Sequence, residues 1–362
     1  MDKAQLEAKF NRFCSNLKES DNIAIIHHSD ADGICSALIT AKAIERLAGK
    51  RPVAVCPYEY GNIEQGRKAV MEMHRKKANK LVVVDIGIDS APHGLGEKYS
   101  FEECLVIDHH KMYRDLNGKN LVFLKAQFFT KKDPSGYVTS KFAFDLFGKL
   151  VDISDLDWVA CIGIMGDMNL KRWKQFVRKT IMKRNLSLSW FYSFLELIAA
   201  VEVLANSMVT KLFWALYDAE DPEQVLQGPF KKYLERFREE RDSLVERFDE
   251  KAEYVPALDL YFYAIRSRHE NIKSYVINQL SETRPDKTII LIQYLPDGRV
   301  RFSARRQDFK VRVNDLLVEA VKGIPEASAG GHAPAAAGSI PKRALTRFKG
   351  NIVQILDKTY KK

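Results

Sequence analysis

The segment IAIIHHSDADG, residues 23–33, is an apolar run that ends abruptly in two histidines and two aspartates. The run is rich in β-branched residues, as is typical of a strand buried on both faces of a sheet. The residues that follow it read as a helix. In an open α/β sheet, sites lie beyond the carboxyl ends of the strands. The segment therefore predicts a central parallel strand whose end opens onto a site.

Three more apolar runs follow, and helical patterns separate the first two. They are PVAVCPY (52–58), KLVVVDIG (80–87) and ECLVIDHH (103–110). Short strands alternating with helices predict a parallel sheet with helices on both faces. Three of the four runs end in aspartate or histidine, so we expect these side chains to share one crevice.

Helical patterns dominate the middle of the chain. Residues 136–169 read as helical, 189–219 as one buried helix because they are apolar almost all round, and 229–254 as a charged connecting helix with an apolar stripe.

Strand patterns return near the end, at 258–267, 288–295 and 299–305. Pro-Asp-Gly at 296–298 joins the last two as a hairpin. The glycine-rich segment SAGGHAPAAAGSIP (328–341) lies between two predicted helices.

The predicted architecture is α/β, in three parts. A metal-binding domain with a parallel sheet flanked by helices covers 1–185, a helical connector covers 186–255, and a smaller α/β domain covers 256–362.

Composition narrows the class of protein. The 362 residues are 46% hydrophobic and 29% charged, and contain no apolar run long enough to span a membrane. The N-terminus reads as a charged amphipathic helix rather than a secretory signal, and five scattered cysteines form no CxxC pair, so we expect a cytoplasmic protein with reduced thiols. A net charge of +10 favours a polyanionic partner. Oligomeric state is left open, a homo-oligomer included.

The polar residues at the strand ends are candidate metal ligands. His28, Asp30 and Asp32 alternate, so an extended backbone would turn them to one side. Four further residues bring the number of candidate ligands to about seven. One ion needs only four to six ligands, so the set predicts two ions. The further candidates are Asp85, His109, His110 and Asp167.

The ligand types bear on the metal and on the alternatives. Mixed nitrogen and oxygen ligands suit manganese, iron or zinc, whereas an all-oxygen set suits magnesium. A single aspartate after a strand is often only a helix cap, and His27 is expected to be structural because it points away from His28. The whole set resists that interpretation, because so much buried negative charge requires cations.

Four ordered motifs resemble those of the DHH phosphoesterases, a family that includes RecJ-type exonucleases, nano-RNA hydrolases and cyclic dinucleotide phosphodiesterases. They are HSDADG (28–33), Asp85 in VVVDIG, Asp108-His109-His110 and GDMN (166–169). The glycine-rich segment is similar to the GGH motif of the DHHA1 domain found in the same family.

The resemblance implies a role for each matching residue. His28, Asp30 and Asp32 would ligate metal, Asp85 would bridge two ions, and His109 and Asp167 would complete the set. Asp108 would orient a histidine, and His110 would ligate metal or touch the phosphate. The sequence departs from the family at His28, where many bacterial RecJ proteins have aspartate, and at Asn169, where several members have a second acid. The resemblance thus assigns catalysis to Asp30, Asp32, Asp85, Asp108, His109 and His110.

In the second domain the resemblance implies a phosphate-binding set. Gly330, Gly331 and His332 match the GGH loop, and Ser303 and Arg305 match a phosphate-binding strand, although Arg306 stands where serine is common. Without the motif, the glycines would read as an ordinary turn and Arg305 as a surface arginine.

A basic segment lies between the two domains. Residues 170–185 carry seven lysines or arginines and no acid. Basic groups along a strand with an interleaved aromatic residue are typical of single-strand binding. The alternative, slightly favoured by the helical spacing, is a solvated amphipathic helix. The candidate strand contacts are Lys171, Arg172, Trp173 and Lys174.

The resemblance implies a phosphodiesterase with two divalent ions, Mn²⁺ first and Mg²⁺ or Co²⁺ as alternatives. We expect it to trim single-stranded DNA, RNA or short oligonucleotides to nucleoside 5′-monophosphates. Alternatives are a cyclic dinucleotide or dinucleotide phosphodiesterase, and a non-catalytic partner in a replication or repair complex, against which the intact ligand set argues.

Overall fold

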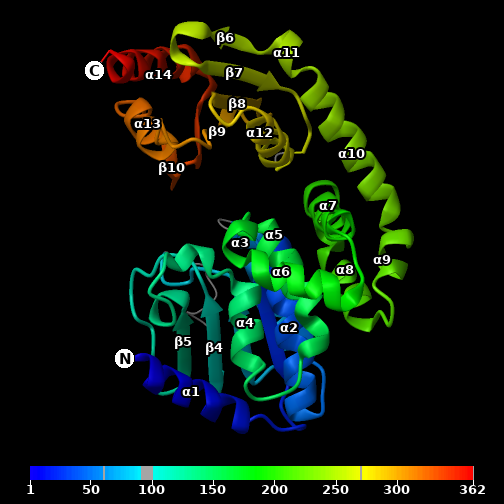
Figure 1. Ribbon diagram of the computed structural model, residues 1–362. Helices are drawn as coiled ribbons and strands as arrows, with labels where there is room; N and C mark the ends of the chain where they lie inside the picture. The colour runs from blue at the N-terminus through cyan, green and yellow to red at the C-terminus, as the bar shows by residue number, and fades with distance from the viewer. Residues whose placement is uncertain (60–61, 91–100, 270, 362) are drawn as a thin grey trace. The chain divides into compact units, whose positions relative to one another are not determined.

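The computed structural model describes residues 1–59, 62–90, 101–269 and 271–361. Its helices and strands are shown in Figure 1. The chain divides into two compact units, residues 1–234 and 235–362. Each unit has hydrophobic clusters of its own. The α/β fold with a parallel first sheet is confirmed.

The sheet of the first unit has five parallel strands in the order β2-β1-β3-β4-β5. Four of them match the expected apolar runs, and β5 was not expected. The bounds are β1 Ile23–His28, β2 Ala54–Tyr58, β3 Lys80–Val84, β4 Glu103–Asp108 and β5 Leu121–Lys125.

The alternation of side chains explains why β1 lies inside this sheet. Ile23 and Ile25 join a hydrophobic cluster on one face, whereas Ala24 and Ile26 join a second cluster on the other face. Both faces of a parallel strand are therefore buried, as the apolar run predicts. Only the end of the strand meets polar surroundings.

The helices of the first unit cover both faces of the sheet. Helix α3 packs on β2 from one side, and α2 packs on β1, α4 and α5 on the other. The bounds are α1 Lys3–Ser15, α2 Ala31–Ala48, α3 Ile63–Arg75, α4 Thr139–Phe147, α5 Asp157–Gly166, α6 Leu170–Arg184, α7 Leu188–Leu204, α8 Val209–Asp218 and α9 Glu223–Gln227.

Two long helical predictions are broken in the structure. The expected single helix over 189–219 is two helices, α7 and α8, separated at Ala205 and a short 3₁₀ turn, Asn206–Met208. The expected helical region 136–169 contains α4 and α5, separated by residues 148–153 and a short 3₁₀ turn, Ser154–Leu156. Asparagine and serine compete for backbone hydrogen bonds and so favour such breaks, which apolar periodicity does not register.

The second unit contains a six-stranded mixed sheet in the order β10-β11-β9-β8-β7-β6, in which β7 and β8 run parallel. The strands are β6 Glu253–Val255, β7 Leu260–Ile265, β8 Thr288–Tyr294, β9 Arg299–Arg305, β10 Ser328–His332 and β11 Ala335–Pro341. Helix α10, Lys231–Glu246, crosses the boundary between the two units, and the helices after it are α11 Phe248–Lys251, α12 Ile272–Thr283, α13 Val313–Ala320 and α14 Leu345–Tyr360.

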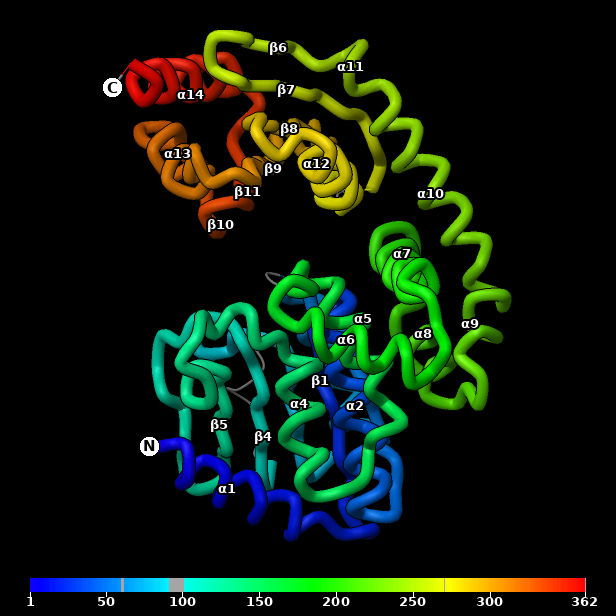
Figure 2. Tube along the Cα trace, viewed as in Figure 1, coloured from blue at the N-terminus to red at the C-terminus, as the bar shows by residue number. Residues whose placement is uncertain are grey.

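The glycine-rich segment is not a simple loop. It forms the β10–β11 hairpin, which adds to the sheet beside β9 (Figure 2). The segment between 186 and 255, predicted as a connector, is divided by the boundary between the units, and α7 to α9 belong to the first. The three-part division stays a prediction.

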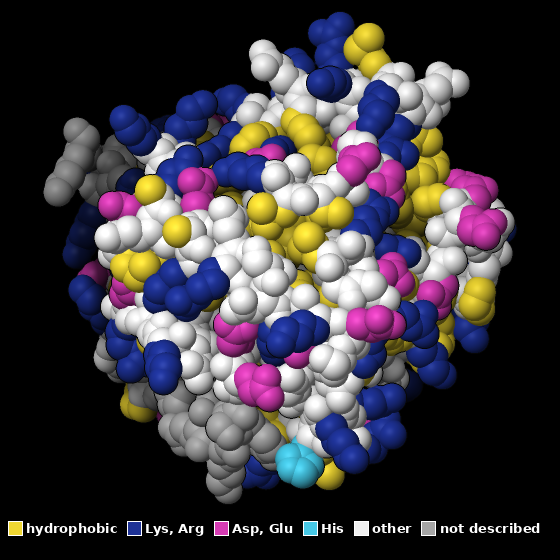
Figure 3. Space-filling model, turned by 90° about the horizontal axis from the view of Figure 1, so that it is seen from below, with side chains coloured by type: hydrophobic (Ala, Val, Ile, Leu, Met, Phe, Trp, Pro, Cys, Tyr) yellow, Lys and Arg dark blue, Asp and Glu magenta, His cyan; other side chains and the backbone are white. Residues whose placement is uncertain are grey.

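The described surface carries mixed charge. In the face drawn in Figure 3, lysines and arginines are interspersed with acids, and hydrophobic side chains show between them. Among the helices of the described residues, none alone has the length and hydropathy of a membrane span; α6 and α7 meet that criterion only as a pair bent by 106°.

Candidate metal centre

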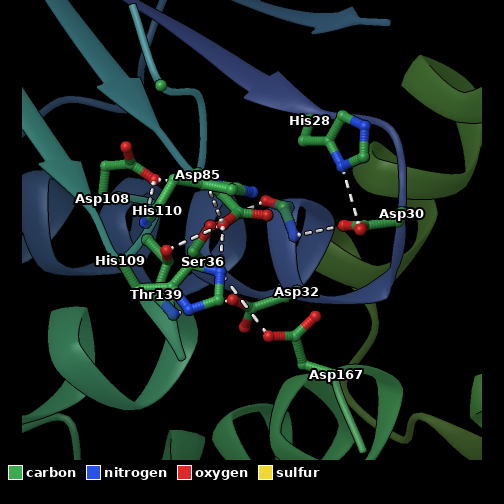
Figure 4. A network of polar contacts seen from close by, with 12 residues as sticks. His28, Asp30, Asp32, Ser36, Asp85, Asp108, His109, His110, Thr139 and Asp167 are labelled. Atoms are coloured by element: carbon green, nitrogen blue, oxygen red, sulfur yellow. Dashed lines mark hydrogen bonds and ion pairs between the residues drawn. The ribbon is translucent and has the colours of Figure 1, made fainter. Parts of the chain in front are cut away.

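The backbone brings the polar strand ends together. His28 is the last residue of β1, Asp85 follows β3, and Asp108 is the last residue of β4. These three strands are neighbours and parallel, so their carboxyl ends meet at one edge. Asp167, which ends α5, faces the same place (Figure 4).

All seven candidate ligands fall into three overlapping groups, each with its ligand atoms within 4.8 Å of one another. Asp85 belongs to two groups and His109 to two, so the groups form one continuous centre. The groups are His28, Asp30 and Asp85; Asp85, His109 and His110; and Asp32, His109 and Asp167.

Asp30 is both a helix cap and a candidate metal ligand, the two interpretations that the sequence allowed. One oxygen caps α2 by accepting the amide of Gly33 at 2.9 Å, and the other lies 2.9 Å from Nδ1 of His28. A Cβ at position 33 would lie 2.1 Å from the carbonyl oxygen of His28. Glycine at that position therefore lets the helix start directly against the strand end, which places Asp30.

Asp32 is oriented by the start of α4, a contact that the sequence did not reveal. Its two oxygens accept the amides of Thr139 at 2.7 Å and Ser140 at 3.0 Å. The hydroxyl of Thr139 donates to Asp85 at 2.8 Å. A helix N-terminus favours negative charge, so α4 holds two carboxylates of the centre in fixed positions.

His109 presents one ring nitrogen to the centre. Its Nδ1 lies 2.8 Å from the carbonyl oxygen of Ser135, so Nδ1–H donates there. Nε2 lies 3.5 Å from both Asp85 and Asp167. A histidine whose other nitrogen donates to a carbonyl is the usual form of a metal ligand.

Asp108 lies behind the centre and orients His110. Asp108 Oδ1 is 2.7 Å from Nδ1 of His110, and its other oxygen pairs with the ammonium of Lys125. Lys125 is fully buried and also lies 3.0 Å from Asp89. His110 is the most exposed side chain of this set, at 41%, so it is the group of the centre that is most accessible to solvent.

Crowding of the carboxyl groups changes their pKa values. Burial, reinforced by the charges of Asp32 and Asp30, raises the pKa of Asp85 well above its ordinary value. Burial raises the pKa of Asp167 to about 6, although His109 acts in the opposite sense. Burial would lower the pKa of His28, but Asp30 raises it well above the usual range. Burial and the neighbouring carboxylates thus disfavour the ionised forms of Asp85 and Asp167.

This donor set fits divalent cations. It offers carboxylate oxygens and imidazole nitrogens that converge from separate elements, the mixed set preferred by manganese, iron or zinc. Burial, with the charges of neighbouring carboxylates, raises the pKa values of Asp85 and Asp167. Cations in the centre would compensate the charge of the ionised carboxylates.

In the second unit, strand register places four of the five predicted phosphate-binding residues on one face, whereas Gly331 is aligned with Ala304 on the other. Arg305 pairs across the sheet with Ala335, which pairs with His332. In the next row of that face, Ser303 is aligned with Gly330. The hydroxyl of Ser303 is buried and has no hydrogen-bond partner among the described residues.

Arg305 is an unpaired guanidinium. It donates to Asn278 at 2.8 Å, no carboxylate of the described residues pairs with it, and burial lowers its pKa to about 10. Arg306, by contrast, is 1% exposed and pairs with Asp308 at 2.8 Å. The departure at 306 is therefore structural, whereas Arg305 has capacity for an anion.

The four predicted strand contacts on helix α6 are of two kinds, two that are bonded within the first unit and two that are exposed. Arg172 donates to the carbonyl of Asp133, and Trp173 donates to that of Gly136 at 2.8 Å, so both are bonded to the loop before α4. Lys171 and Lys174 are exposed. Within this predicted set, the two lysines remain available to a strand.

Two family models match the chain. The DHH family N-terminal domain matches residues 22–160, and the DHHA1 domain matches residues 261–361. A search of the curated proteins finds no match.

Several solved structures share the fold. RecJ from Thermus thermophilus in complex with Mn²⁺ is 16% identical with a TM-score of 0.68, over 98% of this chain and 54% of that one. A pGpG-specific phosphodiesterase, PggH from Vibrio cholerae, is 14% identical with a TM-score of 0.53, over 93% of this chain and 99% of that one. CDC45 from Entamoeba histolytica is 11% identical with a TM-score of 0.53, over 100% of both chains. The present chain thus spans about half the length of the Thermus protein.

Proposed function

This chain belongs to the DHH family and carries a DHHA1 domain, and we propose that it is an exonuclease that hydrolyses single-stranded DNA, RNA or short oligonucleotides to nucleoside 5′-monophosphates. The observation that carries the proposal is the continuity of the centre, in which Asp85 and His109 each belong to two of the three ligand groups. Such sharing suits two cations side by side, the arrangement that serves in-line hydrolysis of phosphoesters.

We assign one cation to His28, Asp30 and Asp85, and the second to Asp32, His109 and Asp167. Asp85 lies between the two sets and is the candidate bridge. Mn²⁺ is the proposed ion, with Mg²⁺ and Co²⁺ as alternatives, because nitrogen ligands contribute to both sets. When bound, the cations supply an activated water and neutralise phosphate charge.

The chain's own groups orient the reactants. Asp108, compensated by Lys125, accepts a hydrogen bond from Nδ1–H of His110 and so fixes the orientation of that ring. With its proton on Nδ1, the neutral ring presents the lone pair of Nε2, so His110 is suited to ligate a cation. In the second unit, Ser303, Arg305 and His332 lie on one face, and Arg305 can donate two charge-assisted bonds to phosphate.

The solved neighbours support this substrate class without separating its members. One is a RecJ bound to Mn²⁺ and another is specific for the dinucleotide pGpG. A dinucleotide or cyclic dinucleotide phosphodiesterase is the second candidate, favoured by the full-length overlap with the pGpG enzyme. We propose a cytoplasmic setting, because all five cysteines are unpaired thiols. A replication or repair partner and a homo-oligomer belong to the same proposal.

The test offers the purified chain, with Mn²⁺, four substrates in parallel: end-labelled single-stranded DNA, RNA, a dinucleotide and cyclic di-AMP. We expect mononucleotides to be released from the strand end. Asp85→Asn, which keeps the side-chain shape, should reduce the rate at least ~100-fold because it removes the shared ligand. Full activity in this variant would exclude the two-cation centre, and turnover of the dinucleotides alone would favour the second candidate.

A further inference from the structure

A second basic site lies in the second unit, at a hollow of about 920 Å³. We call it the β7–β8 hollow, because it lies where those strands end. Arg266 and Arg268 follow β7, and Tyr294 ends β8. Since these strands run parallel, both ends meet at the same edge of the sheet.

Lys342 reaches the same hollow from a distant part of the chain. It follows the end of β11, and its amide donates to the carbonyl of Gly298 at 3.0 Å. Its ammonium lies 5.6 Å from the centre of the Tyr294 ring. Backbone contact with the β8–β9 turn therefore brings a third cation beside the two arginines.

The positive charges of the hollow are not compensated by acids of the described residues. Arg266, Arg268 and Lys342 are exposed, and none forms an ion pair with an acid of the described residues. The hollow's only lining acid among the described residues is Glu240, which accepts a hydrogen bond from Ser267 at 2.6 Å. Three uncompensated cations around one concave surface favour a polyanion.

The hollow is separate from the predicted phosphate-binding residues. Tyr294 pairs with Val300 near the start of β9, whereas Arg305 ends that strand. Five residues of strand span roughly 17 Å. A ligand that occupied both places would have to be a chain of several phosphates rather than a single nucleotide.

We propose that the β7–β8 hollow binds the phosphate backbone of single-stranded nucleic acid, with the three cations on phosphates and the half-buried ring of Tyr294 against a base. Basic groups with an adjacent aromatic ring are the usual means of holding such strands without sequence preference. The inference rests on the proposed function in one respect, that a strand is the substrate. Such a site would let the second unit bind strands that are longer than a dinucleotide.

The experiment measures binding of a fluorescent oligothymidylate to the full chain, with a chelator present, over a range of salt concentrations. The variant combines Arg266→Gln, Arg268→Gln and Lys342→Gln. Each single-strand phosphate contact contributes about 0.7 to the slope of log Kd against log salt. We expect the slope to fall by about 2 in the triple variant and by about 0.7 in Arg268→Gln alone.

The matched control removes three exposed cations elsewhere in the same unit, through Lys322→Gln, Arg347→Gln and Lys358→Gln. It should keep the wild-type slope. An equal loss in the control, or an unchanged slope in the variant, would overturn the proposal. So would a variant that keeps its strand binding and loses only binding of polyglutamate, since that would indicate an acidic protein segment. Because the readout is binding, a chain that hydrolyses nothing would refute the proposed function and leave this inference standing.

Discussion

At the scale of single residues, the least expected feature is a lysine with no exposed surface. Lys125 lies between Asp108 and Asp89, which are buried as well. Asp89 in turn accepts the amide of Arg114 at 3.1 Å, just beyond the Asp-His-His motif. Lys125 therefore connects the residue that orients His110 with the loop that follows it.

Replacing Lys125 by methionine should destabilise the first unit by about 3–5 kcal/mol, because two buried carboxylates would lose their cation. All four tryptophans lie before residue 234, so urea unfolding followed by tryptophan fluorescence reports on this unit. Lys119→Met, at an exposed position, should change stability by less than about 0.5 kcal/mol. Equal values for the two variants would mean that Lys125 is not a buried charge.

His27 gives a prediction about pH. It is fully buried, its Nδ1 lies 2.7 Å from the carbonyl oxygen of His28, and burial lowers its pKa to about 4. The unfolded chain binds this proton first as pH falls. The stabilisation is therefore complete above pH ~6.5 and is lost progressively toward pH ~4.

His27→Asn retains a donor near Nδ1 and cannot titrate in this range. With chelator present, wild type should lose about 2–3 kcal/mol more than this variant on going from pH ~7 to ~4.5. The measurement is urea unfolding at both pH values, with the exposed His74→Asn as control. Parallel losses in wild type and His27→Asn would show that His27 is protonated while folded.

At the scale of elements, the β10–β11 hairpin depends on one glycine and not on its neighbour. Gly331 has φ +135°, and a Cβ there would lie 2.5 Å from the carbonyl oxygen of Ala335 and 2.6 Å from Ala336 Cα. A Cβ at Gly330 would meet nothing within 4 Å among the described residues. Gly331 is therefore required by the backbone conformation and by the close approach of the two strands, whereas Gly330 is not.

Gly331→Ala should destabilise the second unit by about 1–3 kcal/mol, because alanine is strained at this φ and clashes with backbone atoms. Gly330→Ala should stay within about 0.5 kcal/mol of wild type. The measurement is calorimetry. The transition of the second unit is the one that tryptophan fluorescence does not detect, because all four tryptophans lie in the first unit. If both variants melted alike, the close approach of the two strands would be wrong.

At the scale of the whole molecule, the two units have separate cores. The clusters of the first unit end at Leu234, and that of the second begins at Leu258. All metal-ligand candidates lie in the first unit. A ligand that binds only one folded unit stabilises that unit alone.

Mn²⁺ at about one hundred times its dissociation constant should raise the melting temperature of the first unit by roughly 5–10 °C. Tryptophan fluorescence should show this shift, while the other calorimetric transition stays in place. Asp85→Asn serves as the control, since loss of the shared ligand should abolish most of the shift. A Mn²⁺ shift confined to the other transition would place the ion elsewhere.

The sequence by itself determined four of the five strands of the first sheet and the residues of the candidate centre. Buried strands read as apolar runs, and the residues after them converge because parallel strands end at one edge. Six of the seven predicted ligands are brought together for this reason, and Asp167 joins them from the end of α5. The order of motifs likewise indicated both family domains, which the family models confirm.

Only the tertiary structure decided which groups support that centre. These groups come from segments that are distant in the chain, and no periodicity in the sequence indicates them. They are Lys125, Thr139 and Ser140. Lys125 had one missed signal, the run LVFLK, a fifth strand that ends in a charge. The β10–β11 hairpin was also missed, because its small residues become strand through pairing with β9. Side-chain compensation and strand pairing are long-range interactions, so they form only when the chain is folded.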